Sequence, residues 1–118
     1  MNKTYINPSD LMQTIKEFYD PASWRFITVN ALEIENGYEI QWIFTAIDQK
    51  IEEKIFFATI DYETVVPSIV SIVPPAKYSE AEMQDLLGVV FERANYGIFL
   101  EPDAPKAPLL RKNRDQTA

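Results

Sequence analysis

Three carboxylates that lie close together, Glu80, Glu82 and Asp85, have the residue type and spacing best suited to chemistry in this chain. Paired carboxylates bind metal ions or exchange protons. The chain has no cysteine and no histidine, so it lacks the usual ligands of iron–sulfur clusters and structural zinc, and the commonest general base. A metal site is therefore the weakest interpretation of the triplet. We expect no catalytic residue, no cofactor and no metal in this chain alone.

The start of a helix explains two of the three carboxylates without any ligand. The run 79–82, Ser-Glu-Ala-Glu, has the form of a capping box, in which the serine hydroxyl accepts from an amide and the second glutamate reaches back to the serine amide. Negative charge in the first turn is also favoured by the helix dipole, by about 0.3–1 kcal/mol. Asp85 is not explained by capping. It is a candidate to pair with an arginine of a neighbouring subunit, or with Arg93 or Arg111 of this protein.

Composition argues against several other functions. The formal net charge of −7 is the wrong sign for a protein that tracks nucleic-acid phosphates. The sequence has only three glycines and no phosphate-cradling glycine loop. A hydroxyl nucleophile would lack its usual histidine base. We interpret the aromatic residues as sheet core and subunit interface rather than as a stacking platform for bases or flavin: Trp24, Phe26, Trp42, Phe44, Phe56 and Phe57.

Two helices are expected from the spacing of apolar residues. The first covers residues 10–19, begins at a Ser9 cap and ends at Asp20-Pro21. The second begins at the capping box and ends at Gly88, which falls where a left-handed cap is needed. Its apolar face is expected to consist of Met83, Leu86 and Leu87.

Strands are expected over residues 24–35, 38–45, 54–62 and 65–73. The first two are separated by Asn36-Gly37, a strong hairpin signal because both turn positions require positive φ. The last is expected to end at Pro74-Pro75, which cannot donate to a sheet ladder. The sequence thus predicts an α+β fold, with a predominantly antiparallel sheet of about four strands packed by two helices.

At 118 residues, 47% of them hydrophobic, the protein has material for one core. We expect a single domain over residues 1–105 and an extended tail over residues 106–118. Prolines at positions 102, 105 and 108 predict the extended conformation, and residues 106–118 carry four of the eleven basic residues: Lys106, Arg111, Lys112 and Arg114. The N-terminus has no signal-peptide pattern, and no apolar run reaches the roughly 20 residues of a membrane span.

A family resemblance rests on the segment from Val66 to Val89. Its elements are Val66-Pro67-Ser68, Pro74-Pro75-Ala76, Tyr78, Glu80, Ala81, Glu82, and Asp85-Leu86-Leu87-Gly88-Val89. The order and spacing resemble the signature of the 30-kilodalton subunit of proton-pumping NADH:quinone oxidoreductase. Relatives of that subunit serve in energy-converting nickel–iron hydrogenases and formate hydrogenlyases. A second match lies in Pro102-Asp103 and Pro108-Leu109-Leu110-Arg111-Lys112.

The sequence departs from that pattern at identifiable places. Ala81 stands where the family has arginine, and Tyr78 where it usually has tryptophan. The family's Gly-His-Pro-Asp-Leu-Arg-Arg segment is absent, and residues 93–98 occupy its place. Together with the short length, these departures fit a hydrogenase-type relative better than an NADH dehydrogenase subunit.

The resemblance implies a noncatalytic accessory subunit of a membrane-associated redox complex. Its expected partners are the large subunit that carries the nickel–iron or quinone site, and the iron–sulfur small subunit. The nickel–iron site, iron–sulfur clusters or quinone would all belong to those partners. The protein would then be cytoplasmic, held at the cytoplasmic face of the membrane only through its partners. The residues expected at the partner interface are Glu80, Glu82, Asp85, Arg111 and Lys112.

A second interpretation comes from a different class of protein. A free-standing binding module would recruit a peptide or partner through its sheet edge, by strand addition, or through its basic tail. It would require an exposed and unprotected strand edge. An unrecognised small enzyme, with Asp85 as its best residue, is a third and weaker interpretation.

Overall fold

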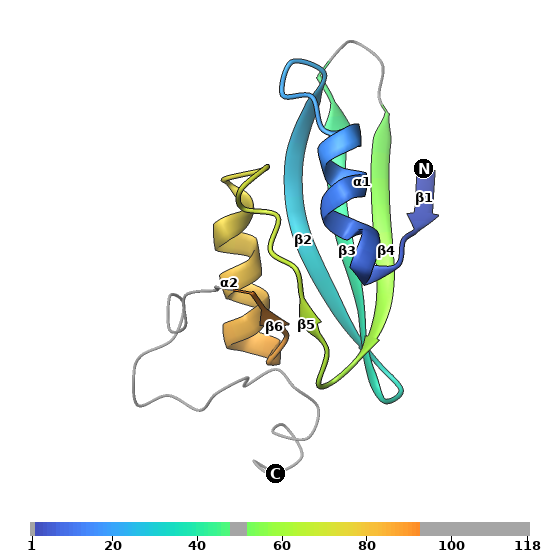
Figure 1. Ribbon diagram of the computed structural model, residues 1–118, viewed down its shortest axis with the longest axis vertical. Coiled ribbons are helices and arrows are strands. Elements are labelled where there is room, and N and C mark those ends of the chain that lie inside the picture. The colour runs from blue at the N-terminus through green and yellow to red at the C-terminus, as the bar shows by residue number, and fades with distance from the viewer. Residues whose placement is uncertain (1, 48–51, 93–118) are drawn as a thin grey trace.

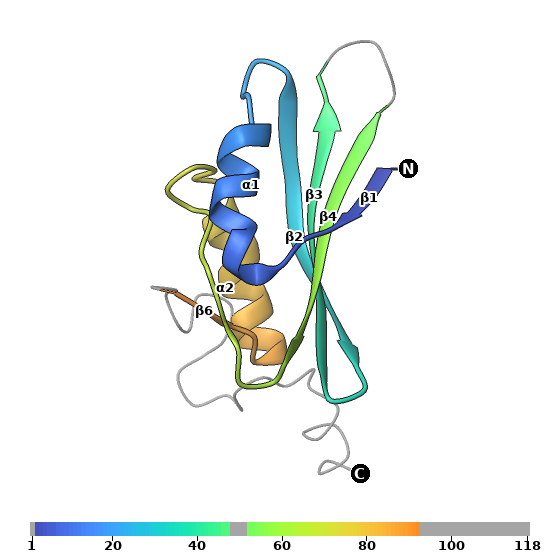
Figure 2. The same cartoon turned by 45° about the vertical axis from the view of Figure 1, so that its right-hand side comes forward.

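The computed structural model describes residues 2–47 and 52–92, with one main sheet and both α-helices on the same face of it (Figure 1, Figure 2). The sheet has four strands in the order β1-β4-β3-β2, in which β1 is parallel to β4 and the other neighbours are antiparallel. A separate pair, β5 and β6, is parallel. The elements are β1 (Asn2–Tyr5), a 3-10 turn η1 (Pro8–Asp10), α1 (Leu11–Phe18), β2 (Trp24–Ile34), β3 (Gly37–Ala46), β4 (Glu53–Asp61), β5 (Val65–Val66), α2 (Ala76–Leu87) and β6 (Val90–Phe91).

The predicted α+β fold with four principal strands and two helices is confirmed. The proposed boundary between residues 105 and 106 and the tail that follows it lie outside the described residues. Neither described helix is long and apolar enough to cross a membrane.

The start of α1 differs from the prediction. Asn7 caps the preceding turn η1, because its Oδ1 accepts from the backbone N–H of Ser9 at 3.1 Å. The N-cap of α1 itself is Asp10, whose side chain makes no capping hydrogen bond. Ser9 lies inside η1, and its hydroxyl donates to the same oxygen at 2.9 Å. The expected Ser9 cap is therefore wrong. Leu11 and Ile15, one turn apart, are fully buried and hold α1 on the sheet.

The hairpin of β2 and β3 forms as predicted, but its turn lies one residue earlier. Ile34 pairs with Gly37, so Glu35 and Asn36 make the turn, and Asn36 has φ of 65°. Gly37 belongs to β3 and does not supply positive φ. It is needed for a different reason: a Cβ at this position would lie 1.9 Å from the carbonyl oxygen of Ile60 on β4.

The core lies between the sheet and the two helices. Alternate residues of β3 point into it, and each is at most 2% exposed: Tyr38, Ile40, Trp42 and Phe44. Phe18 of α1 joins the aromatic part of this core, with its ring centroid 4.7 Å from that of Trp24 and 4.9 Å from that of Phe56. The aromatic residues therefore serve largely as sheet core, as predicted, although Phe57 faces the opposite side of the sheet, beside Tyr5.

The expected fourth strand over residues 65–73 is wrong beyond its first two residues. Only Val65–Val66 is a strand, and the backbone then turns and crosses toward α2. Ile69 and Val73 are nevertheless fully buried, so the segment supplies core contacts without sheet pairing. The short strands β1 and β6 were not predicted, because each has too few residues for a visible alternation.

Candidate functional site

The helix α2 carries the acidic triplet, and it begins three residues before the predicted capping box. Pro75 is its N-cap, with φ of −61°, and no side-chain oxygen caps it. Proline suits this position because the first helical amides have no intrahelical acceptor and the ring fixes φ near the helical value. Ser79 lies within the helix, where its hydroxyl contacts that of Thr28 on β2 at 3.2 Å. The predicted capping box is therefore wrong.

Glu80 is an internal anchor for the segment that leads from β5 to α2. Only 2% of the residue is exposed. One carboxylate oxygen accepts from the Ser68 hydroxyl at 2.6 Å, and the other accepts from the backbone N–H of Ile69 at 2.9 Å. The carboxylate thus supplies a hydrogen-bond acceptor of the kind that a neighbouring strand would otherwise provide to this segment. Burial raises the pKa of Glu80 above its ordinary value of 4.5, although both hydrogen bonds act in the opposite direction.

The buried face of α2 is unusually polar. Besides Glu80, it presents Gln84 and Asp85, which are 4% and 6% exposed. The expected apolar face is only partly correct: Met83 and Leu87 pack against the core, whereas the fully inward positions are polar or alanine. Sequence reasoning missed Gln84, whose position one turn after Glu80 is the signal that would have placed it on the same face.

The end of α2 is fixed by two groups. Gly88 has φ of 80°, the left-handed cap that the sequence predicted. The hydroxyl of Tyr38 donates to the carbonyl oxygen of Leu87 at 2.7 Å, which satisfies one of the carbonyls left free at the end of a helix. Burial, together with the nearby Tyr62 and Glu33, raises the pKa of Tyr38 to about 12.

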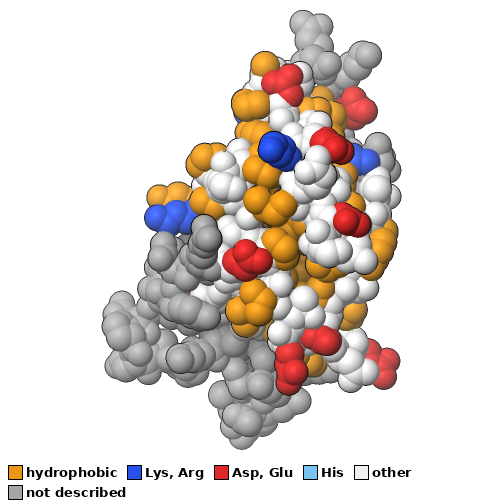
Figure 3. Space-filling view, in the orientation of Figure 1, with side chains coloured by type: hydrophobic (Ala, Val, Ile, Leu, Met, Phe, Trp, Pro, Cys, Tyr) orange, Lys and Arg blue, Asp and Glu red, His pale blue; other side chains and the backbone are white. Residues whose placement is uncertain are grey.

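The opposite face of α2 is open to solvent. Tyr78 is 63% exposed, Lys77 is exposed, and Glu82 is half-buried. The space-filling view shows a basic side chain beside apolar ones over the start of this helix (Figure 3). We call Pro74, Pro75, Lys77, Tyr78 and Glu82 the outer α2 surface. Of the residues expected to contact a partner, only Glu82 lies on this surface; Glu80 and Asp85 face inward, and Arg111 and Lys112 lie outside the described residues.

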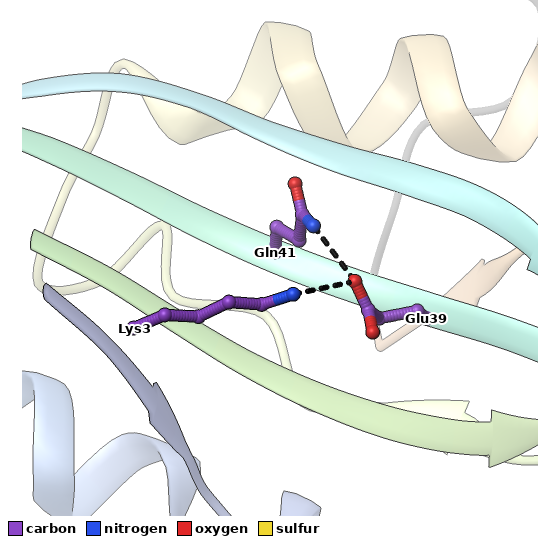
Figure 4. A network of polar contacts seen from close by, with 3 residues as sticks. All are labelled: Lys3, Glu39 and Gln41. Carbon is purple, nitrogen blue, oxygen red and sulfur yellow. Dashed lines mark hydrogen bonds and ion pairs between the residues drawn. The ribbon is translucent and has the colours of Figure 1, made fainter. Parts of the chain in front are cut away.

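The open face of the sheet carries a polar network that joins β1 to β3 (Figure 4). The Lys3 ammonium group lies 3.3 Å from a carboxylate oxygen of Glu39, which also accepts from the Gln41 amide at 2.7 Å. The side chain of Lys3 extends across β4 and passes 4.5 Å from the ring centroid of Phe57. This network attaches the N-terminal strand to the rest of the sheet.

No group of three or more histidine, cysteine, aspartate or glutamate side chains within residues 2–47 and 52–92 is arranged to hold a metal ion. Two of the buried polar groups of α2 contact the protein itself: Glu80 contacts residues 68 and 69, and the Gln84 side-chain oxygen accepts from the backbone N–H of Phe91 at 3.3 Å. One face of α2 thus makes internal contacts, and its outer surface is exposed.

Comparison with known proteins identifies the family and the fold. No curated protein matches the sequence. A solved structure described as the membrane-bound sulfane sulfur reductase, an archaeal respiratory membrane complex, contains a subunit with the same fold: the TM-score is 0.69 at 17% identity, over 96% of this chain and 68% of that one. The family model for the respiratory-chain NADH dehydrogenase 30 Kd subunit matches residues 4–118. This chain therefore belongs to the 30 Kd subunit family of respiratory-chain NADH dehydrogenase.

Proposed function

We propose that this protein is a noncatalytic accessory subunit of a membrane-associated redox complex, of the energy-converting nickel–iron hydrogenase or NADH:quinone oxidoreductase type. The observation that carries the proposal is the family match, which spans residues 4–118. The fold likeness to a subunit of an archaeal respiratory membrane complex supports it. The proposed partners are the large subunit, which carries the nickel–iron or quinone site, and the iron–sulfur small subunit. The redox cofactors belong to these partners, which hold the protein at the cytoplasmic face of the membrane.

The outer α2 surface is the proposed contact with the large subunit. Within the family segment, Glu80 and Asp85 are buried inside this protein and are therefore not available to a partner. What the segment presents to a partner is Tyr78, the most exposed large hydrophobic residue described, next to Pro74 and Pro75. Tyrosine is enriched in interfaces because it buries a large area with few rotatable bonds. Each proline adds apolar surface, and its ring already restricts the backbone φ angle.

The C-terminal tail is proposed to contact the same large subunit through Arg111 and Lys112. The basic tail has the opposite sign to the rest of the protein: residues 1–105 carry seven basic and seventeen acidic residues, whereas residues 106–118 carry four basic residues and one acidic residue. A basic contact at the rim of an interface contributes mainly to orientation and association rate. Interfaces of this obligate kind bury more than about 2,000 Å² in total.

Affinity capture tests the proposal. The tagged full-length protein is used to capture proteins from gently solubilised membranes of the source organism, and mass spectrometry identifies what is retained. We expect a large subunit of the nickel–iron or quinone-site type together with an iron–sulfur subunit. Recovery of neither would refute the proposed function.

A pair of tyrosine variants tests the proposed surface in the same experiment. Tyr78→Ser removes the exposed ring of the outer α2 surface, whereas Tyr5→Ser removes a ring of similar exposure, 54%, from the open face of the sheet. We expect Tyr78→Ser to lower the yield of the large subunit and Tyr5→Ser to leave it unchanged. Equal yields from both variants would show that the outer α2 surface is not the contact.

A further inference from the structure

The segment that joins β5 to α2 lies at the surface and carries no charge. Residues 64–76 form the longest stretch of the sequence without Asp, Glu, Lys or Arg, although 25% of all residues are charged. The segment runs along α2, on the side of the sheet that both helices cover (Figure 1, Figure 2). Ser71, Pro74 and Pro75 are exposed to solvent. Because surfaces are where charged residues are mostly found, their absence from an exposed segment of this length requires an explanation.

The residues of this segment that do not face the core are largely apolar. The core-facing residues are fully buried: Val66, Ile69, Val73 and Ala76. The other apolar residues are half-buried or exposed: Pro67, Val70, Ile72, Pro74 and Pro75. We call these last five residues the apolar ridge. Figure 3 shows apolar side chains along this side of the molecule, between α1 and α2. A contiguous apolar patch on a protein surface indicates a site that another molecule covers.

The apolar ridge has a fixed conformation, although it belongs to no strand of the main sheet. The Glu80 carboxylate accepts from the Ser68 hydroxyl and from the Ile69 amide. The carbonyl oxygen of Ile69 in turn accepts from the backbone N–H of Ile72 at 3.0 Å and of Val73 at 2.8 Å. Three of the five ridge residues are prolines, whose rings fix φ. A partner that binds the apolar ridge therefore loses little affinity to the ordering of this segment.

We infer that the apolar ridge extends the contact with the large subunit and packs against an uncharged, apolar face of that protein. This inference rests on the proposed function. Pro74 and Pro75 belong to both the apolar ridge and the outer α2 surface, so the two surfaces are continuous. A partner charge placed against the ridge would lose its water without gaining a counter-charge, so an uncharged face is the complementary one. A lipid surface is disfavoured, because the protein has a net charge of −7 and cytoplasmic membrane surfaces are anionic.

Ser71→Lys tests the inference in the tagged full-length protein. It places a charge between Val70 and Ile72 at an exposed position, so the core is left intact and the variant should fold. Ser71→Ala changes the same position without adding a charge, and Thr59→Lys adds the same charge to an exposed residue on the open face of the sheet. Each variant captures proteins from gently solubilised membranes at a limiting amount of bait. We expect Ser71→Lys to lower the yield of the large subunit about tenfold or more, and the other two variants to leave it unchanged.

The outcomes separate this inference from the proposed function. If wild type and Ser71→Lys capture the large subunit equally well, or if Thr59→Lys loses as much of it as Ser71→Lys, the inference is overturned and the proposed function stands. Capture of neither redox subunit by wild type would refute the proposed function and the inference with it. Sedimentation with vesicles of phosphatidylcholine and phosphatidylglycerol tests the lipid alternative. We expect the two lysine variants to sediment equally; a difference between them would place the apolar ridge at a lipid surface and overturn the inference.

Discussion

Replacing Glu80 with alanine removes both acceptors that hold residues 68 and 69 against α2. The backbone N–H of Ile69 would then be buried without a partner, which costs about 1–3 kcal/mol. Loss of the Ser68 hydroxyl contact adds about 0.5–1.5 kcal/mol. Removal of a buried carboxylate offsets part of this cost. We therefore expect Glu80→Ala to lower the free energy of unfolding by about 2 kcal/mol.

Glu80→Gln is the matched control, because it keeps the volume and the hydrogen-bonding capacity of the side chain. Its amide oxygen can accept from Ile69, and its amide nitrogen can donate to the Ser68 oxygen. We expect its free energy of unfolding to stay within about 1 kcal/mol of wild type. Urea denaturation, followed by the fluorescence of the fully buried Trp42, measures both variants.

The stability of wild type relative to Glu80→Gln is predicted to depend on pH. Because folding raises the pKa of Glu80, the contribution of this group is fully present below its unfolded value of 4.5 and is lost as pH rises through the folded pKa. Wild type should therefore lose stability relative to Glu80→Gln as pH rises above about 4.5. If Glu80→Ala were as stable as wild type, or if Glu80→Gln were as unstable as Glu80→Ala, the internal anchor would be refuted.

Two further substitutions test the packing around α2 and the hairpin. Gly37→Ala places a methyl group against a β4 carbonyl oxygen, 1.9 Å away before any relaxation, and should lower the free energy of unfolding by about 1–3 kcal/mol in urea denaturation; a neutral effect would contradict the close approach. Tyr38→Phe removes the hydrogen bond to the Leu87 carbonyl oxygen and should lower the free energy of unfolding by about 1 kcal/mol. Spectrophotometric titration should then lose the tyrosine whose pKa is about 12. Because that pKa is raised by folding, the contribution of Tyr38 is lost only as pH rises through it. A titration curve that is unchanged in Tyr38→Phe would contradict this assignment.

The parts of the fold that could be predicted are those in which local pattern and burial agree. The alternation of β3 puts Trp42 and Phe44 into the core as expected, and Gly88 ends α2 as expected. The hairpin was predictable, but its exact turn was not: Gly37 pairs with Ile34 inside β3, where the close approach of β4, a tertiary contact, leaves no room for a Cβ.

The rest depended on contacts that sequence pattern does not encode. The apolar run after Val66 has the composition of a strand, yet Glu80 satisfies the Ile69 amide that a neighbouring strand would otherwise have paired. Strand propensity takes no account of a side-chain acceptor such as the Glu80 carboxylate, and it therefore assigned this run to a strand. The capping-box pattern was misleading for a similar reason, because Pro75 had already started the helix one turn before Ser79.

The edges of the sheet bear on the alternative of a free-standing binding module. The edge strand β1 has only four residues. The other edge, β2, has a register irregularity between Phe26 and Thr28 and is flanked by α2, which its Thr28 hydroxyl contacts. Short edges, bulges and covering helices all oppose strand addition. These features favour the proposed accessory subunit, whose proposed contact uses side chains of α2.

Chemical cross-linking within the captured complex shows whether the outer α2 surface contacts the large subunit. An amine-reactive cross-linker reports on Lys77 of the outer α2 surface, and on Lys3 and Lys54 of the region where β1 joins β4. We expect cross-links from Lys77 to the nickel–iron or quinone-site large subunit, and none to that subunit from Lys3 or Lys54. Cross-links to the large subunit from Lys3 or Lys54 and none from Lys77 would contradict it.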